Sequence, residues 1–268
     1  MAHSPLPILE RRRFGETLRR DLWWLPNVPV LIVFSSFLAY GLWAGWQNAY
    51  YTHGPYLSPF YSPELWGDSP HAIFGPKPIW WPSWLPFSPA LIILPLPGLF
   101  RFTCYYYRGA YYKAFWADPP SCAVGEPRKS FRGENSFPLI LQNVHRYFMY
   151  IALIFLFILG YDAYKAFWFT DGITGQRQFG IGVGTILLVT NVTFLTLYTL
   201  GCHSFRHLIG GVKDRLSGSP VRKVAYDCSS CLNRWHMQWA WTSLFTVAFA
   251  DIYIRLCAMG IWADWRIL

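Results

Sequence analysis

Apolar side chains dominate five stretches of the sequence, each long enough to cross a membrane as an α-helix. A helix needs about 20 residues to cover a hydrocarbon core about 30 Å thick. The predicted spans are approximately residues 26–46, 89–107, 137–161, 179–203 and 235–256. The ten-residue alternation typical of membrane β-strands does not occur in the sequence. The pattern therefore predicts an all-α, polytopic membrane protein, in which residues 1–268 form a single domain of five transmembrane helices.

The segment between the first two predicted spans has a different composition. Residues 47–87 are rich in Pro, Trp, Tyr and Gly. Proline disfavours helix, and Trp and Tyr rings are enriched at membrane–water boundaries. We therefore expect this outer loop to fold as a cap at the membrane surface. Prolines also interrupt the second span, where Pro95 and Pro97 lack backbone donors and predict a kink.

The overall composition fits a membrane protein. Hydrophobic residues make up 53% of the chain and charged residues only 14%, whereas soluble domains carry about 25% charged residues. The low charge argues against an ordinary soluble enzyme. The 20% aromatic content excludes a disordered chain, which would be polar and poor in aromatic residues.

The formal net charge of +9 is distributed unevenly along the chain. Of 23 Lys and Arg residues, 17 lie in the N-terminal segment and in or beside the connections after the second and fourth spans, and five lie on the other side. Lys and Arg accumulate in cytoplasmic loops of membrane proteins. We therefore expect a cytoplasmic N-terminus and an outer C-terminus, and we interpret the positive charge as a topology signal rather than as a nucleic-acid site.

Cysteine and histidine residues gather on the predicted cytoplasmic half of the bundle. They are Cys104, Cys122, Cys202, Cys228, Cys231, His145, His203, His207 and His236. Cysteines that face a reducing compartment are not expected to form disulfides. Cys228 and Cys231 form a lone CxxC motif, which is weak evidence for zinc or redox chemistry.

The sequence GCHSFRHLIGG at the end of the fourth span carries a stronger metal signal. His203 and His207 are four residues apart, so on one helix they share a face and can bind one metal ion. Cys202 lies about 100° around the same helix. Two imidazoles and a thiol at a membrane boundary are costly unless they are paired or used, which favours a metal or cofactor site over a structural role.

Polar residues also enter the third span. Gln142, Asn143, His145 and Arg146 lie two to three turns into this apolar stretch. Polar groups at that depth must face protein, water or a ligand. A quinone headgroup site and hydrogen bonding between helices explain them equally well.

Two carboxylates lie near the outer ends of the predicted spans. Asp162 belongs to the end of the third span and Asp251 to the end of the fifth. They either relay protons or form structural pairs with the nearby Lys165 and Arg255. The sequence favours neither role.

Several blocks of the sequence resemble one known family, the five-helix membrane anchor of actinobacterial-type succinate dehydrogenase, which is the cytochrome-b-like C subunit of complex II. The resemblance covers about residues 20–260 and rests on RFTCYYYRGAYYKAFW, PPSCAV, RGENSFPLILQNVHRYF, LYTLGCHSFRHLIGG and WHMQWAWTSLF. It implies an anchor in a bacterial cell membrane that holds the flavoprotein and iron–sulfur subunits at the cytoplasmic face and passes electrons to a quinone. It implies no stand-alone activity, and it allows a higher oligomer of the whole complex.

The resemblance also implies a cofactor. At least one type in this group lacks haem and carries a Rieske-like [2Fe–2S] cluster, which needs two Cys on one iron and two His on the other. The preferred ligands are Cys202 with His203 or His207, plus Cys104 or Cys122, with His145 and His236 in reserve. The alternative is one b-type haem, held by His145 together with His203 or His236.

Quinone reduction near the cytoplasmic face requires groups that contact the quinone carbonyls and a nearby cation. The candidates are His145, Arg146, Tyr147, Tyr105 and Arg101. Two other functions stay open. Prolines and polar residues within the spans favour a transporter or channel subunit, although repeated halves are lacking. A structural anchor that binds no cofactor is the second alternative.

Overall fold

A computed structural model of the chain describes residues 13–128, 137, 139–172, 174–211 and 215–268. The third predicted span includes residue 138, which lies outside the described residues. The same holds for five of the basic residues assigned to the cytoplasmic side, namely Arg11, Arg12, Lys129, Arg132 and Lys213.

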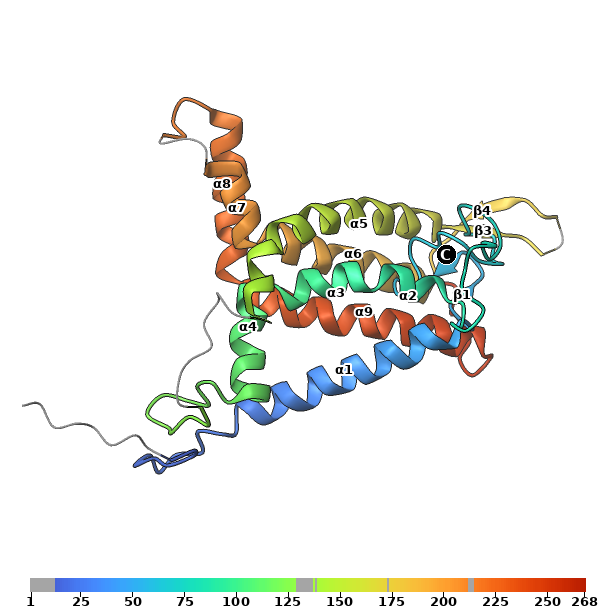
Figure 1. Cartoon of the computed structure of the whole chain (residues 1–268). Helices are drawn as coiled ribbons and strands as arrows, with labels where there is room; N and C mark the ends of the chain where they lie inside the picture. The colour runs from blue at the N-terminus through green and yellow to red at the C-terminus, as the bar shows by residue number, and fades with distance from the viewer. Residues whose placement is uncertain (1–12, 129–136, 138, 173, 212–214) are drawn as a thin grey trace, which may run out of the picture.

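Helices run side by side between two ends of the molecule (Figure 1). One end, which we call the arm end, carries three further helices, α4 (Tyr105–Tyr111), α7 (His203–Gly210) and α8 (Pro220–Arg234). The opposite end, which we call the cap end, carries the strands and the C-terminus. The first described residues lie at the arm end, so the two ends of the described chain lie on opposite sides of the bundle, as an odd number of crossings requires (Figure 1).

Four helices are long and apolar enough to cross a membrane. They are α1 (Asn27–Gln47), α5 (His145–Lys165), α6 (Val183–Leu200) and α9 (His236–Ala258). A 3₁₀ stretch, Leu139–Val144, precedes α5, and the apolar helix runs over Ile140–Lys165. In α1 the only fully buried residues are Ala44 and Gly45, so most of this helix is left to contact lipid. The structure thus confirms an all-α polytopic fold.

The second predicted span is shorter than the sequence suggested. α2 (Pro89–Ile93) and α3 (Pro95–Phe102) form one apolar stretch of 14 residues, with an interruption at Leu94 beside the prolines. At about 1.5 Å per residue this stretch covers about 21 Å. It ends at Phe102 rather than at residue 107, because Cys104 is extended and α4 leaves at a steep angle to α3 (Figure 1). The predicted count of five full-length spans is therefore not established.

The fourth predicted span is also shorter than expected. Residues 177–179 form strand β4 (Arg177–Phe179), which pairs with β3 (Trp168–Thr170), so the helix begins only at Val183. At the other end the helix stops at Leu200, and the extended residue Cys202 separates it from α7. His203 and His207 therefore do not continue the spanning helix.

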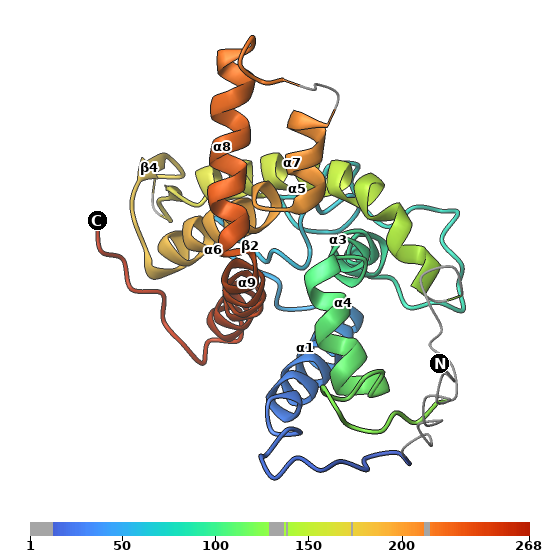
Figure 2. The same cartoon turned by 90° about the vertical axis from the view of Figure 1, so that its left-hand side faces the viewer.

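Gly201 explains why the fourth helix breaks there. A Cβ atom at Gly201 would lie 2.8 Å from the Leu197 carbonyl oxygen and 3.2 Å from Leu232 of α8. Two side chains of α8 bind the carbonyls that the break leaves free: Ser229 Oγ donates to Leu200 over 2.8 Å, and Asn233 Nδ2 donates to Gly201 over 2.7 Å. α8 thus holds the interruption, and α7 and α8 together project from the bundle (Figure 2).

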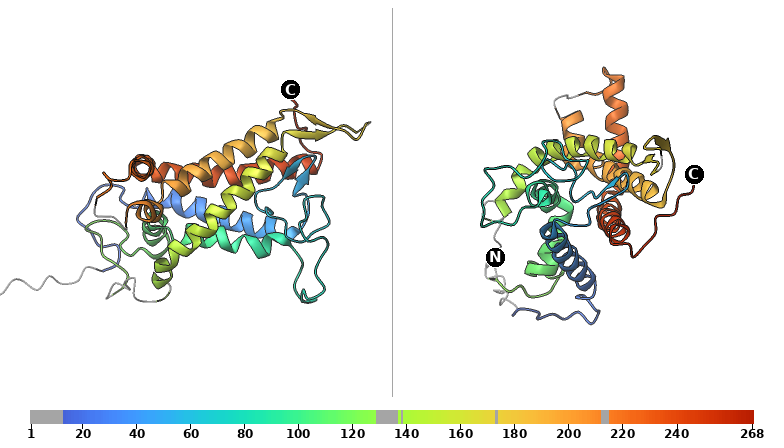
Figure 3. Two further views of the ribbon diagram at one scale, coloured as in Figure 1. Left: turned by 90° about the horizontal axis from the view of Figure 1, so that it is seen from above. Right: turned by 90° about the vertical axis from the view of Figure 1, so that its right-hand side faces the viewer.

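Residues 48–88, which we call the cap, fold over the other end. The short strands β1 (Thr52–His53) and β2 (Tyr56–Leu57) form an antiparallel hairpin within it. Tyr56 and Tyr61 are completely buried. The C-terminal residues return to the same end, where Leu268 bonds to Ile181. Figure 3 shows the cap and both hairpins gathered there.

The two carboxylates near the outer ends of the spans form ion pairs. Asp251 is buried in α9, where Arg255 Nε lies 3.3 Å from its carboxylate and Tyr40 and Ser58 donate to it. Arg255 also donates to the Ala49 carbonyl over 2.7 Å, so the network joins α9, α1 and the cap. Asp162 lies 2.8 Å from Lys165 Nζ. Structural partnership is therefore what the structure shows for both.

Replacing Arg255 by Leu is expected to destabilise the protein strongly. The Asp251 carboxylate would stay buried without its cation, which typically costs about 3–5 kcal/mol. The thermal midpoint of the purified complex measures the effect. The control is Asp227→Asn, which breaks an exposed pair with Lys223 in α8 and is expected to cost less than about 1 kcal/mol. Equal midpoints for the two variants would contradict this account of the network.

Candidate functional site

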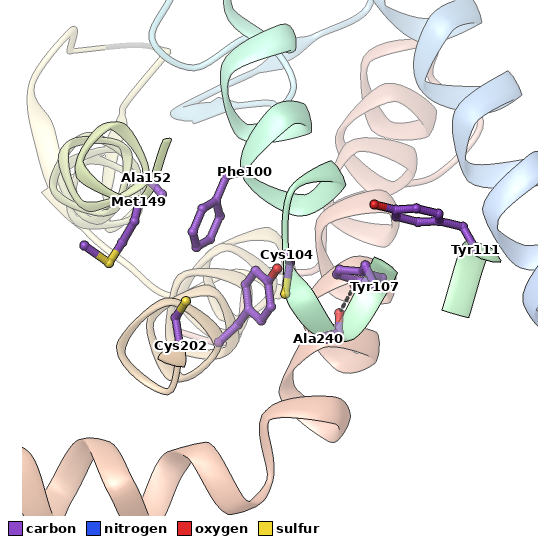
Figure 4. Packing of buried hydrophobic residues seen from close by; sticks show 9 residues of the cluster. Phe100, Cys104, Tyr107, Tyr111, Met149, Ala152, Cys202 and Ala240 are labelled. Carbon is purple, nitrogen blue, oxygen red and sulfur yellow. Dashed lines mark hydrogen bonds between the residues drawn. The ribbon is translucent and has the colours of Figure 1, made fainter. Parts of the chain in front are cut away.

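Two thiols and two imidazoles converge at the arm end of the bundle. Cys104 follows α3 and Cys202 follows α6, whereas His145 and His236 are the first residues of α5 and α9. The His145 Nε2 atom lies 3.2 Å from Cys202 Sγ, and the His236 Nε2 atom lies 3.5 Å from Cys104 Sγ. Figure 4 shows the two cysteines within one buried cluster, on separate turns of the chain.

The two cysteines occupy equivalent local positions. Each is an extended residue directly before a short helix, with φ and ψ of −64° and 132° at Cys104 and −67° and 139° at Cys202. In both places an apolar helix of the bundle has just ended and the chain changes direction at the arm end. The turn brings each thiol back against the bundle, where both are almost completely buried.

The tautomer of His145 is fixed by its surroundings. Thr103 Oγ1 donates to the Leu99 carbonyl over 2.7 Å, so its oxygen accepts from His145 Nδ1, 2.8 Å away. A proton on Nδ1 leaves Nε2 with a free lone pair, and this atom faces Cys202. The Phe100 ring stacks on the imidazole at 4.9 Å, with 8° between the planes.

His236 contacts Cys104 through Nε2 and is otherwise held by packing. Tyr198 stacks on its ring at 4.9 Å. The Nδ1 atom of His236 is buried and has no hydrogen-bond partner among the described residues. Buried polar atoms are normally satisfied, so this nitrogen is free to interact with a bound group.

A cavity of about 620 Å³ joins the four side chains. Its other lining residues are mostly polar, namely Thr103, Tyr105, Tyr106, Arg108, Gln142, Asn143, His203, Ser204 and Asn233. Gln142 accepts a hydrogen bond from Arg108 and donates one to Tyr111, so it faces protein, as does the buried His145, whereas Asn143 and Arg146 are exposed. Within the described residues, no three His, Cys, Asp or Glu side chains are arranged to hold a single metal ion.

The structure does not bring the other candidate ligands into this group. His203 and His207 are exposed on α7, with their Nε2 atoms 3.0 Å apart, and only His203 lines the cavity. Partial burial and the neighbouring His207 and Arg206 lower the pKa of His203. Cys122 is exposed in a turn, and its backbone carbonyl accepts a hydrogen bond from Arg19. Cys228 and Cys231 are exposed on α8.

Of the quinone candidates, three line a cavity and two do not. Tyr105 and His145 line the polar cavity. Arg101 donates to the Tyr107 hydroxyl, the Ala240 carbonyl and Ser243, and lies 4.8 Å over the Tyr198 ring. Arg146 and Tyr147 are exposed and line neither this cavity nor the apolar one described next.

A second, apolar cavity of about 430 Å³ lies among α1, α2, α3, α5 and α6. Phe100, Arg101 and Tyr198 bound it toward the arm end, and Pro59 and Phe60 of the cap also line it. Phe100 and Tyr198 are the rings that stack on the two histidines. One layer of aromatic rings therefore separates the apolar cavity from the thiol–imidazole site. The sequence analysis missed Thr103, Phe100 and Tyr198, and only the position of Thr103 beside Cys104 hinted at a role.

Comparisons with known proteins give consistent results. The model of the family described as actinobacterial succinate dehydrogenase subunit SdhC matches residues 25–260. A chain of a solved structure, the Mycobacterium smegmatis Sdh1 complex in the apo form, is similar with a TM-score of 0.84 and 39% identity, over 97% of each chain. No match was found among curated proteins.

Replacing Gly201 by Ala is expected to disturb the turn that places Cys202. The added methyl group would press on Leu197 and Leu232, and overpacking of this kind costs about 1–3 kcal/mol. The thermal midpoint of the purified complex should fall. Gly160→Ala is the matched control because no atom lies within 4 Å of its added Cβ, and Ala is the better helix former there. A drop in midpoint for Gly160→Ala alone would contradict this view of the turn.

Proposed function

The chain belongs to the family of actinobacterial succinate dehydrogenase SdhC subunits, and we propose that it relays electrons from a docked iron–sulfur subunit to a membrane quinone. It is a membrane-anchor subunit of succinate:quinone oxidoreductase, and other subunits of that complex are its partners. This membership replaces the transporter or channel alternative. The electron donor would dock at the arm end. Basic residues gather there, and Lys and Arg accumulate on the cytoplasmic side of membrane proteins, which supports a cytoplasmic arm end in a bacterial cell membrane.

A Rieske-like [2Fe–2S] cluster is the cofactor that best fits the thiol–imidazole site. Cys104 and Cys202 would hold one iron, and His145 and His236 the other. This set replaces His203 and His207, which the sequence favoured, by the two reserve histidines. When bound, such a cluster accepts and donates one electron at a time. In such a cluster each iron is bound by only two protein side chains. The cluster therefore does not require three side chains arranged around a single metal ion, an arrangement that the described residues lack.

Three properties of the described residues support this ligand set. The donor types are two thiols and two imidazoles, which a Rieske-like cluster requires. Thr103 holds His145 in the tautomer that can ligate a metal through Nε2. The Nδ1 atom of His236 is buried and forms no hydrogen bond among the described residues, so no protein partner competes with a ligand for this imidazole nitrogen. The observation that carries the proposal is the convergence of these four side chains on one cavity.

The haem alternative fits the same residues less well. A b-type haem is held between two opposed imidazoles. Here the Nε2 atom of each histidine faces a thiol, at 3.2 Å and 3.5 Å. Phe100 and Tyr198 also cover one face of each imidazole. The arrangement therefore favours ligands that act together with sulfur.

Replacing Cys202 by Ser is expected to remove the cluster while leaving succinate oxidation intact. The purified complex should lose about two iron atoms per anchor chain, together with the paramagnetic-resonance signal of the reduced Rieske-like cluster. Succinate oxidation with a dye as acceptor should continue, since it takes place on the partner subunits. Cys122→Ser, a change at an exposed thiol outside the cavity, is the control and should keep both signal and iron.

Other spectroscopic outcomes would count against the cluster. A Cys202→Ser complex that retains the Rieske-type signal would exclude Cys202 as a ligand. A sharp reducible absorption band in the unaltered complex would indicate haem. The absence of both signals from the unaltered complex would indicate a structural anchor without a cofactor.

For the quinone, the arm end of the apolar cavity is the position that we propose. Within the described residues Arg101 forms no ion pair, and its three hydrogen-bond acceptors are uncharged. Its positive charge therefore remains available to stabilise negative charge that develops on a quinone oxygen in a low-dielectric site. The apolar walls beyond Arg101 suit the hydrocarbon tail.

Replacing Arg101 by Gln is expected to lower quinone reductase activity by about 100-fold, the usual effect of removing one such electrostatic group. Dye-linked succinate oxidation and the yield of complex should change little, and they show whether the anchor still assembles. Arg146→Gln is the informative comparison, because Arg146 is exposed and lines neither cavity. A loss in Arg146→Gln, with normal activity in Arg101→Gln, would place the quinone elsewhere at the arm end.

A further inference from the structure

The most exposed apolar surface of the cap lies on the loop that leads into α2. We call residues 72–87 the aromatic loop. Its side chains are unusually open: Ile79 is 105% exposed, Trp84 80% and Trp80 64%. Large exposed apolar groups gathered on one segment mark an interaction surface. Two other rings of the same loop, Trp81 and Phe87, pack against each other, with their ring centroids 5.3 Å apart.

The aromatic loop stands where the membrane is least well spanned. It leads directly into the α2–α3 stretch, which covers only about 21 Å of a hydrocarbon core about 30 Å thick. About 9 Å of that thickness is therefore not covered by this stretch. Figure 3 shows the loop extending sideways from the bundle at the cap end rather than along its axis.

Prolines and local hydrogen bonds lower the cost of placing the backbone of the aromatic loop in an apolar environment. Irregular backbone in lipid is costly because its polar groups lack water. Four prolines, at positions 76, 78, 82 and 86, have no N–H group to satisfy. Trp81 N and Leu85 N bond to the carbonyls of Pro78 and Pro82, and the Trp81 indole donates to Leu85. The loop therefore exposes fewer unpaired donors than its irregular path suggests.

The charge of the loop distinguishes lipid from a protein partner. Residues 72–87 contain no acidic residue, and their only charge is the exposed Lys77. A lysine can extend its ammonium group to the headgroups while its stem stays in apolar surroundings. Tryptophan is the side chain most typical of the membrane–water boundary. A protein interface would be expected to surround its apolar core with a polar rim.

From these observations we infer that the aromatic loop is a re-entrant segment that inserts Ile79, Trp80 and Trp84 into the membrane lipid at the cap end, beside α2. The loop completes the lipid-facing surface that the short α2–α3 stretch leaves uncovered. The inference does not depend on the cofactor or on the quinone position.

Site-specific photo-crosslinking tests this contact directly. A benzophenone-bearing phenylalanine analogue replaces Trp84, and the whole complex is reconstituted in phosphatidylglycerol–phosphatidylethanolamine vesicles and illuminated. Phe157 of α5 is the positive control, because it is also 80% exposed and lies on a spanning helix. Gln178 is the negative control, because it is exposed on the β3–β4 hairpin, which extends away from the bundle (Figure 1).

The expected result is a phospholipid adduct at position 84 with a yield within about twofold of that at position 157, and at least fivefold above that at position 178. An adduct at position 84 with a second copy of the chain or with another subunit would overturn the inference. So would a yield at position 84 that equals the yield at position 178. The variants report on folding as well, because dye-linked succinate oxidation and complex yield should match those of the unaltered protein.

Discussion

Backbone hydrogen bonding in a low-dielectric environment decides how this bundle is interrupted. A helix can end inside or near a membrane only where other groups bind its free carbonyls. At the end of α6, Ser229 and Asn233 of α8 supply those bonds. At the end of α3, Thr103 folds its hydroxyl back onto Leu99. Both interruptions place a cysteine in extended conformation, so the chemistry of the arm end depends on how the helices stop.

The sequence predicted the long helices well and the interruptions poorly. Hydropathy locates α1, α5 and α9 to within a few residues, apart from the 3₁₀ stretch before α5, because each is apolar over its whole length. It overran α3 and α6, because the extended residues Cys104 and Cys202 change the backbone direction without changing the apolar character. The error in α6 placed His203 and His207 on the spanning helix, although they belong to an exposed arm helix. Only tertiary packing, such as that between Gly201 and Leu232, reveals such a turn.

For the candidate site, the sequence identified residue types better than partners. Cys104, Cys202, His145 and His236 were all recognised as unusual, because thiols and imidazoles are costly near apolar helices. Which of them meet depends on four elements that are distant in the chain. Short-range spacing favoured His203 and His207, since a helical face can be computed from a sequence. The pairing of His145 with Cys202 spans 57 residues and has no local signal.

The distribution of the four side chains along the chain has a consequence for biogenesis. They lie at positions 104, 145, 202 and 236, so the group is complete only when the final helix has been synthesised and packed. Chains grow from the N-terminus, and their parts fold as they emerge. A nascent chain that lacks α9 presents Cys104 without its neighbour His236. A chain truncated before α9 therefore cannot assemble the group of two thiols and two imidazoles, because His236 is the first residue of that helix.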